Sequence, residues 1–186
     1  MNLYHFSEDP AIDIFQPRAV EGSRPPEREW LNTPLVWAID EWHAPAYLFP
    51  RDCPRILWWP LSSTTQDDLE RYWERRDCRM VANIEWSWSA RLASTTLFRY
   101  TFDATGFISI EDHGVHVSRE AVQPLAVEPI TDVLAALRGA NVELRLLSSL
   151  TPLSQMWDTT LHVSGMHLRN AAGWAQQPGA SLTASS

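Results

Sequence analysis

Three short segments carry histidine, aromatic or acidic side chains at spacings that suit chemistry. The first covers residues 3–7, where His5 and Ser7 alternate with aromatic side chains as they would along a β-strand. A histidine in the middle of such a strand can turn its ring nitrogens toward a cleft and bind a ligand. The alternative interpretation is an ordinary core histidine whose nitrogens are satisfied by hydrogen bonds.

The second segment covers residues 36–47 and is rich in aromatic side chains. Trp37 would lie at the end of a strand, and Tyr47 would follow on the next helix. Two aromatic rings on adjoining elements can form opposite walls of a slot, which would hold a flat ring by stacking and a cationic ring by cation–π attraction as well. The alternative is an ordinary aromatic core, since the chain has 10 tryptophans.

The third segment covers residues 111–118 and begins with Glu111, Asp112 and His113. Acidic and imidazole groups gathered at the entrance of a strand are half-solvated, which suits proton transfer or the stabilisation of positive charge in a transition state. A polar turn without chemistry has the same composition, and this alternative stays open.

Two arginines and the remaining histidines are weaker candidates. Arg51 and Arg55 flank residues 52–54 and could hold a pyrophosphate group through bidentate hydrogen bonds, or could pair with surface carboxylates instead. His113 and His116 would face opposite sides of a strand. Neither this pair nor His162 with His167 has the spacing of a strong zinc site, so we expect no bound metal.

Composition excludes several classes of function. The 186 residues include 15 basic and 23 acidic side chains, for a net charge of −8, and every basic one is arginine. The absence of lysine excludes a P-loop and Schiff-base chemistry. The acidic balance argues against nonspecific binding to nucleic acids. The 2 cysteines suggest reduced thiols in the cytoplasm, and we expect neither a signal peptide nor a membrane-spanning segment.

These side chains must be positioned by a series of strands and short helices. We expect strands at residues 1–7, 35–39, 55–61, 79–86, 97–103, 107–110, 114–118, 122–127 and 142–147. We expect helices at residues 41–49, 66–76, 131–138, 152–161 and 166–172. The order does not alternate strictly between strand and helix, which favours one α+β domain over residues 1–175 with a mixed or antiparallel core. The small polar residues 176–186 indicate a disordered tail.

In order and spacing, the three segments resemble the motifs of the ADP-ribosyltransferase superfamily. That family has a histidine in its first strand, an aromatic residue in the second with another on the next helix, and a catalytic residue, often Glu, at the start of a later strand. Here LYHFS, LVWAIDEWHAPAY and HGVHVSREAVQP resemble these elements. The resemblance implies a split, mixed or antiparallel β-core with short flanking helices. The last segment is also similar to the RNA 2′-phosphotransferase branch of the superfamily.

The resemblance further implies NAD as a co-substrate and an ADP-ribose transfer to an unknown small-molecule or protein acceptor. His5 would bind the adenosine ribose, Trp37 and Tyr47 would sandwich the nicotinamide, and residues 111–113 would steady the reacting ribose. Two positions depart from the family pattern, because Trp37 replaces a tyrosine and His113 replaces the catalytic glutamate. Glu111 or Asp112 would supply the carboxylate only if the strand entrance bends inward.

Two alternatives of other classes stay open: a catalytically degenerate module of the same fold that binds a nucleotide or a protein, and an RNA 2′-phosphotransferase-like enzyme. The segments YHFSE, VWAIDE and FPRDCPR also resemble an uncharacterised bacterial family of unknown function. That second resemblance implies no activity.

Overall fold

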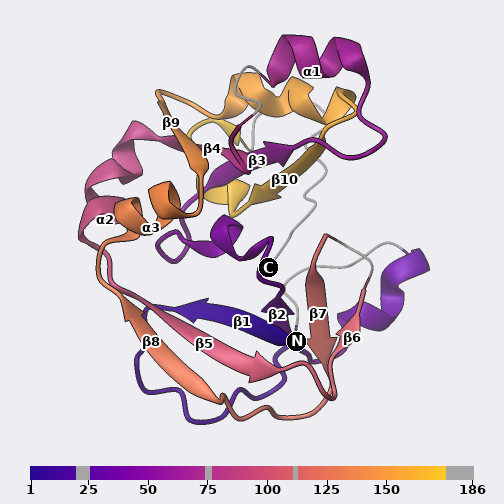
Figure 1. Ribbon diagram of the computed structural model, residues 1–186, viewed down its shortest axis with the longest axis vertical. Coiled ribbons are helices and arrows are strands. Elements are labelled where there is room, and N and C mark those ends of the chain that lie inside the picture. Colours follow the sequence, from indigo (N-terminus) through magenta and orange to yellow (C-terminus); the bar gives the residue numbers. More distant parts are fainter. Residues whose placement is uncertain (20–25, 74–76, 111–112, 175–186) are drawn as a thin grey trace. The chain divides into compact units, whose positions relative to one another are not determined.

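The computed structural model describes residues 1–19, 26–73, 77–110 and 113–174. The chain divides into two compact units (Figure 1). Among the described residues, the first unit consists of Met1–Arg51 and Thr95–Val133, and the second of Asp52–Ser94 and the chain after Val133. Neither unit is therefore a continuous piece of the sequence. That residues 1–175 form a single domain stays a prediction, and the predicted tail lies outside the described residues.

The first unit is built on a six-stranded antiparallel sheet with the order β6-β7-β2-β1-β5-β8. Its strands are β1 (Asn2–Ser7), β2 (Val36–Ile39), β5 (Leu97–Asp103), β6 (Ile108–Ser109), β7 (Val115–Ser118) and β8 (Ala126–Ile130). Two 3₁₀ helices accompany them, η1 (Pro26–Asn32) and η2 (Ala44–Tyr47). The predicted strands around His5 and Trp37 are thus confirmed, and they lie side by side.

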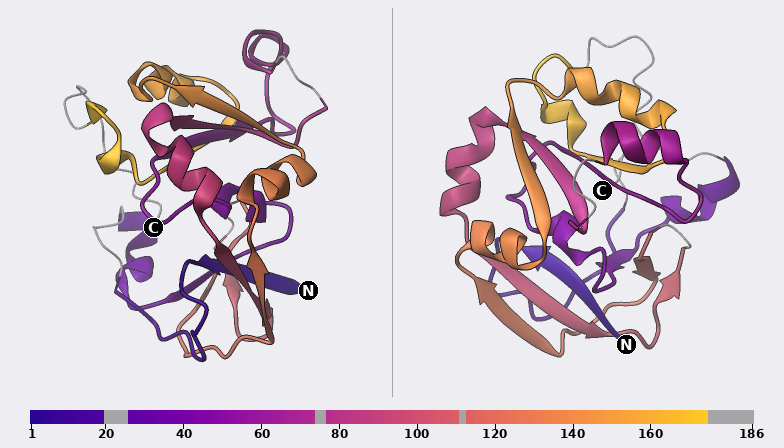
Figure 2. Two further views of the ribbon diagram at one scale, coloured as in Figure 1. Left: turned by 90° about the vertical axis from the view of Figure 1, so that its left-hand side faces the viewer. Right: turned by 45° about the horizontal axis from the view of Figure 1, so that its top comes forward.

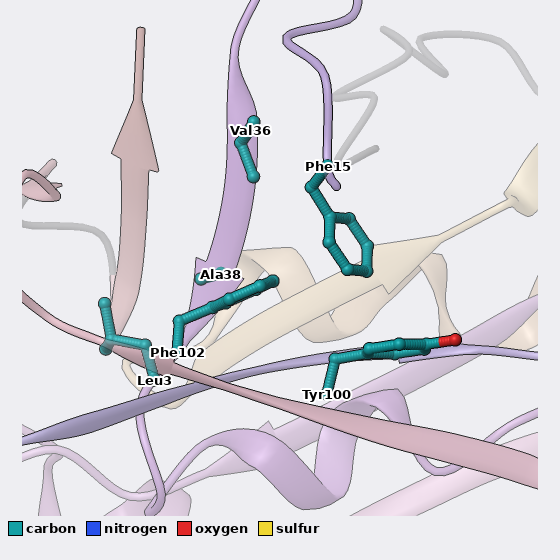
Figure 3. Packing of buried hydrophobic residues seen from close by; sticks show 6 residues of the cluster. All are labelled: Leu3, Phe15, Val36, Ala38, Tyr100 and Phe102. Carbon is teal, nitrogen blue, oxygen red and sulfur yellow. The ribbon is translucent and has the colours of Figure 1, made fainter. Parts of the chain in front are cut away.

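One face of this sheet carries the aromatic core of the first unit. Leu3 on β1 lies opposite Phe102 on β5, and His5 lies opposite Tyr100, so these four side chains project from the same face. Phe15 packs edge-on against both aromatic rings, with centroid separations of 5.0 Å (Figure 3). Because the His5 ring lies 4.8 Å from the same Phe15 ring, His5 belongs to the border of this core.

The second unit is built on a four-stranded sheet with the order β10-β3-β4-β9, in which only β4 and β9 run parallel. Its strands are β3 (Arg55–Trp59), β4 (Met80–Glu85), β9 (Val142–Leu147) and β10 (His162–Met166). Its helices are α1 (Gln66–Tyr72), η3 (Trp86–Trp88), α2 (Ser89–Ser94), α3 (Val133–Gly139, whose first residue belongs to the first unit), η4 (Thr151–Asp158) and η5 (Leu168–Asn170). Figure 2 shows these short helices around the strands.

The central strands of the second sheet are buried along their whole length, as expected for strands covered on both faces. Thr65 caps α1, because its side chain accepts a hydrogen bond from the backbone N–H of Asp68. The α+β class is confirmed. In the described part of the chain, no helix has the length and apolar character needed to span a bilayer.

Several element boundaries differ from the sequence-based expectations. The helix predicted at residues 41–49 is reduced to the single 3₁₀ turn η2, which has a proline at its start. The strand predicted at 122–127 begins only at Ala126; Pro124 has no N–H to donate, and Val122 forms an isolated bridge with Phe15 instead. Strand β10 and helix α2 were not expected at all.

Candidate functional site

His5 is held in one defined protonation and tautomeric state. Its Nδ1 atom lies 3.0 Å from the backbone oxygen of Trp37 on the neighbouring strand β2. Because a carbonyl oxygen can only accept a hydrogen bond, Nδ1 carries the proton and donates it. Burial lowers the pKa of His5 and is the largest effect. The hydrogen bond to Trp37 raises the pKa in part, and the charges of Arg18 and Arg51 lower it further. The ring is therefore neutral at pH 7, and its Nε2 atom is a hydrogen-bond acceptor.

Two arginines lie close enough to His5 for their charges to act on its ring. Arg18 is brought alongside the start of β2 by an isolated bridge with Leu35, and Arg51 donates its backbone N–H to Glu8 Oε1 at 2.7 Å. Both arginine side chains are exposed. A guanidinium group with access to solvent can bind a phosphate through paired hydrogen bonds. The charges of two exposed arginines thus act on a neutral acceptor.

Arg51 was expected at a phosphate site, but Arg18 was missed. Arg18 lies within a proline-rich stretch, residues 17–34, that has no periodic pattern, and only the long-range bridge to Leu35 brings it to the site. No local signal in the sequence could have found it.

The Trp37 ring and His5 lie on opposite faces of the sheet. Side chains alternate along β2, so Val36 and Ala38 belong to the Phe15 core, whereas Trp37 points to the opposite face and packs against the small cluster of Leu31, Leu35 and Val117. Trp37 therefore meets His5 through its backbone oxygen and not through its ring. Tyr47 ends η2 and is half-buried. The predicted sandwich around nicotinamide stays a prediction.

His113 lies in the turn that leads into β7. Both His113 and Gly114 have positive φ angles, 43° and 83°, which is typical of a tight turn of the primed type between antiparallel strands. The centroid of the His113 ring is 6.2 Å from that of His43. The strand β7 therefore begins directly after His113 and Gly114, close to the predicted start. Glu111 and Asp112 lie outside the described residues, so their catalytic role stays a prediction.

Beside this turn, Asp40 and His43 form a hydrogen-bonded pair. Asp40 Oδ1 accepts from both the backbone N–H and the Nδ1 atom of His43, each at 2.8 Å. The backbone N–H of Asp40 donates to the oxygen of Gly114 at 2.9 Å, and His116 Nδ1 donates to the same oxygen at 2.9 Å. A polar cluster of Asp40, His43, His113 and His116 thus surrounds Gly114.

Neither Asp40 nor His43 was among the candidate residues predicted from the sequence. An Asp followed three residues later by His, at the end of a strand, was the signal that could have found the pair. Among the residues that the structure describes, no group of three or more His, Cys, Asp or Glu side chains is arranged to hold a metal ion.

The two remaining candidate residues make local contacts. Ser7, at the end of β1, accepts the backbone N–H of Asp9 at 3.1 Å. Arg55 belongs to the second unit, is only 4% exposed, and donates Nη1 to the backbone oxygen of Cys53 at 3.1 Å. Burial raises the pKa of the Cys53 thiol to about 11, so this cysteine is a protonated, unreactive thiol at pH 7. A phosphate-binding role for Arg55 stays a prediction.

Comparison with known protein families places the chain. Residues 4–171 match the model of a family of unknown function, DUF6886, and the chain belongs to that family. The expected membership of a family without assigned activity is thereby confirmed, whereas this match does not extend to the ADP-ribosyltransferase superfamily. No significant match was found among curated proteins, and none among solved structures.

Proposed function

We propose that the first unit binds NAD and that the protein is an ADP-ribosyltransferase-like enzyme. The observation that carries the proposal is the state of His5, a neutral ring whose Nε2 atom can accept a hydrogen bond, with the exposed side chains of Arg18 and Arg51 nearby. A ribose hydroxyl donates a hydrogen bond and a pyrophosphate carries negative charge, and NAD offers both groups close together. His5 would accept from the adenosine ribose, and the arginines would bind the pyrophosphate.

The reaction would break the bond between nicotinamide and ribose and pass ADP-ribose to an acceptor. The acceptor would be a small molecule or a protein of the cytoplasm. Trp37 and Tyr47 would hold the nicotinamide, and residues 111–113 would stabilise the positive charge that develops on the ribose. Because the Trp37 ring points away from the face of His5, Tyr47→Ala is the sharper test of stacking.

Calorimetric titration with NAD and with ADP-ribose tests the binding step. We expect the wild-type protein to bind both, and His5→Ala to weaken binding about tenfold or more, which corresponds to the loss of roughly 1.4 kcal/mol. His162→Ala is the matched control, because His162 is also a half-buried histidine on a strand but belongs to the second unit. If the wild-type protein binds neither ligand at millimolar concentration, the proposal is wrong.

A second candidate is a nucleotide-binding module without catalytic activity. The presence of His113, rather than a carboxylate, in the turn before β7 favours it. Such a module would bind ADP-ribose but release no nicotinamide from NAD, whereas an enzyme would release it steadily.

Arg18 and Arg51 would also suit a 2′-phosphate. A 2′-phosphorylated RNA end supplied together with NAD therefore tests the RNA phosphotransferase alternative, although the net charge of −8 opposes RNA binding.

A further inference from the structure

We infer that Asp40 and His43 form a proton-accepting pair that activates the acceptor, with His43 as the general base and Asp40 as the residue that positions it. The inference rests on the proposed function and names what that function leaves open, namely the group that removes the acceptor's proton. It also defines the acceptor chemically, as a hydroxyl or an amine that must lose a proton when it attacks.

The geometry of the pair fixes which nitrogen of His43 can act as a base. Asp40 Oδ1 lies 2.8 Å from His43 Nδ1, and a carboxylate oxygen accepts the proton that this nitrogen carries. In the neutral ring, Nε2 is then the nitrogen with an unprotonated lone pair. This is the arrangement of base and orienting carboxylate found in the Ser-His-Asp triad, where a histidine activates a hydroxyl group.

The surroundings of the pair limit its movement. Asp40 Oδ1 also binds the backbone N–H of His43, and the Trp42 ring packs edge-on against His43 with a centroid separation of 4.6 Å. Gly114, in the turn before β7, lies so close that a Cβ atom there would be 2.2 Å from His43 Nδ1 and 2.5 Å from Asp40 Oδ2. The His43 side chain keeps 16% of its surface exposed, so the pair is packed but still reachable.

The pair follows the strand β2, which lies beside β1 and His5 in the sheet. Tyr4 on β1 lies opposite Ile39 on β2, which puts Ala38 opposite His5. Asp40 follows Ala38 by two residues, about 7 Å further along the chain at the rise of a strand. For the inference to hold, the nicotinamide ribose of a bound NAD must reach this end of β2. On the other side of β2, His116 on β7 lies opposite Ala38.

The chemical step balances without any further reagent. The acceptor oxygen or nitrogen forms a bond to C1′ of the nicotinamide ribose, while the bond from C1′ to the ring nitrogen breaks and its electron pair leaves with nicotinamide. Nicotinamide, which carries a positive charge in NAD, departs as a neutral molecule. The proton of the acceptor passes to His43 Nε2, and the resulting imidazolium is stabilised by the Asp40 carboxylate.

The experiment measures nicotinamide release from NAD with two acceptors, water and azide. Azide attacks as an anion and needs no base. We expect His43→Gln to slow release with water by about 10²-fold or more, the usual contribution of a general base, and to restore the rate to within about tenfold of wild type with azide. Asp40→Asn keeps an oxygen that can accept both hydrogen bonds but removes the charge, so we expect a smaller loss with water and the same rescue. His162→Gln, in the second unit, is the control.

Calorimetric binding of ADP-ribose by each variant verifies that the site is intact. Normal binding with slow release in water and rescue by azide supports the inference. If His43→Gln releases nicotinamide into water as fast as wild type, or if azide rescues neither variant, the pair is only a cap of the turn and the inference is overturned. If wild-type protein releases nicotinamide with neither acceptor, the proposed transfer itself fails, and the assignment of a base fails with it.

Discussion

Gly114→Ala should be one of the most damaging single-methyl substitutions in the first unit. Two independent costs act at this position. The φ angle of 83° is in the left-handed region, where an L-residue with a side chain loses about 1–2 kcal/mol relative to glycine. In addition, the new methyl would overlap the Asp40–His43 pair, with contacts of 2.2 Å and 2.5 Å that force a rearrangement. Overpacking of this kind costs about 1–3 kcal/mol.

The two costs can be separated by a matched substitution. Gly106 has nearly the same φ angle, 86°, but a Cβ there would meet no atom within 4 Å. We therefore expect Gly106→Ala to lose only about 1–2 kcal/mol and Gly114→Ala about 2–5 kcal/mol. Gly139 in α3 has neither a positive φ angle nor a close neighbour, so Gly139→Ala should be neutral or should gain up to about 1 kcal/mol.

Urea unfolding of the three variants, followed by circular dichroism, gives the differences in the free energy of unfolding from the shifts in midpoint at constant slope. The steric part of the argument is refuted if Gly114→Ala is no less stable than Gly106→Ala, because the methyl would then fit beside His43 without displacing it. Gly114→Ala should also slow nicotinamide release more than it weakens ADP-ribose binding, since it displaces the base.

Two further predictions concern the dependence of stability on pH. Because the pKa of His5 is lower in the folded protein than its ordinary 6.5, the unfolded chain binds the proton more readily, and stability falls as the pH drops below about 6.5. The urea midpoints at pH 7 and pH 5 should therefore differ less in His5→Gln than in wild type. If the midpoint difference is the same in both proteins, the neutral state of the ring is contradicted. Hydrogen bonds from Thr160 hold the pKa of Asp68 below its ordinary 3.8, so the carboxylate contributes stability above that value and loses it as the pH falls through its lowered pKa. Thermal scans should show Asp68→Ala less stable than wild type at pH 7 and closer to it at about pH 2, whereas a constant difference would point to packing.

The strands β1 and β5 were predictable because their signal is local. Alternation of side chains in β1 and β5 has the period of two that a half-buried strand requires, and both strands were expected close to their observed bounds. Strand β10 gave no such signal, since its sequence HVSGM lacks a run of large apolar residues. The glycine in it is explained only by the folded structure, where a Cβ on Gly165 would lie 2.6 Å from Leu168 Cδ1.

The candidate site shows the same division between local and long-range information. The position of His5 in a strand could be predicted, but the state of its ring depends on Trp37 and on two arginines that approach from distant parts of the chain. The Asp40–His43 pair is local in sequence, yet its constraint comes from Gly114 in the turn before β7. The elements of the site could therefore be predicted more readily than the contacts that define its chemistry.

The interleaved connectivity of the two units sets the order in which they can form during synthesis. β1 must wait for its neighbour β5, since Asn2 pairs with Asp103, and the first unit has all its residues once Val133 has been made. The antiparallel pair of β3 and β4 is made early, but its outer neighbours β10 and β9 arrive only after that point. Until then this apolar pair has two open edges, which are templates for pairing with another chain. Translation pauses between residues 86 and 142 should therefore promote aggregation of the nascent protein, and chaperones that cover strand edges should suppress it.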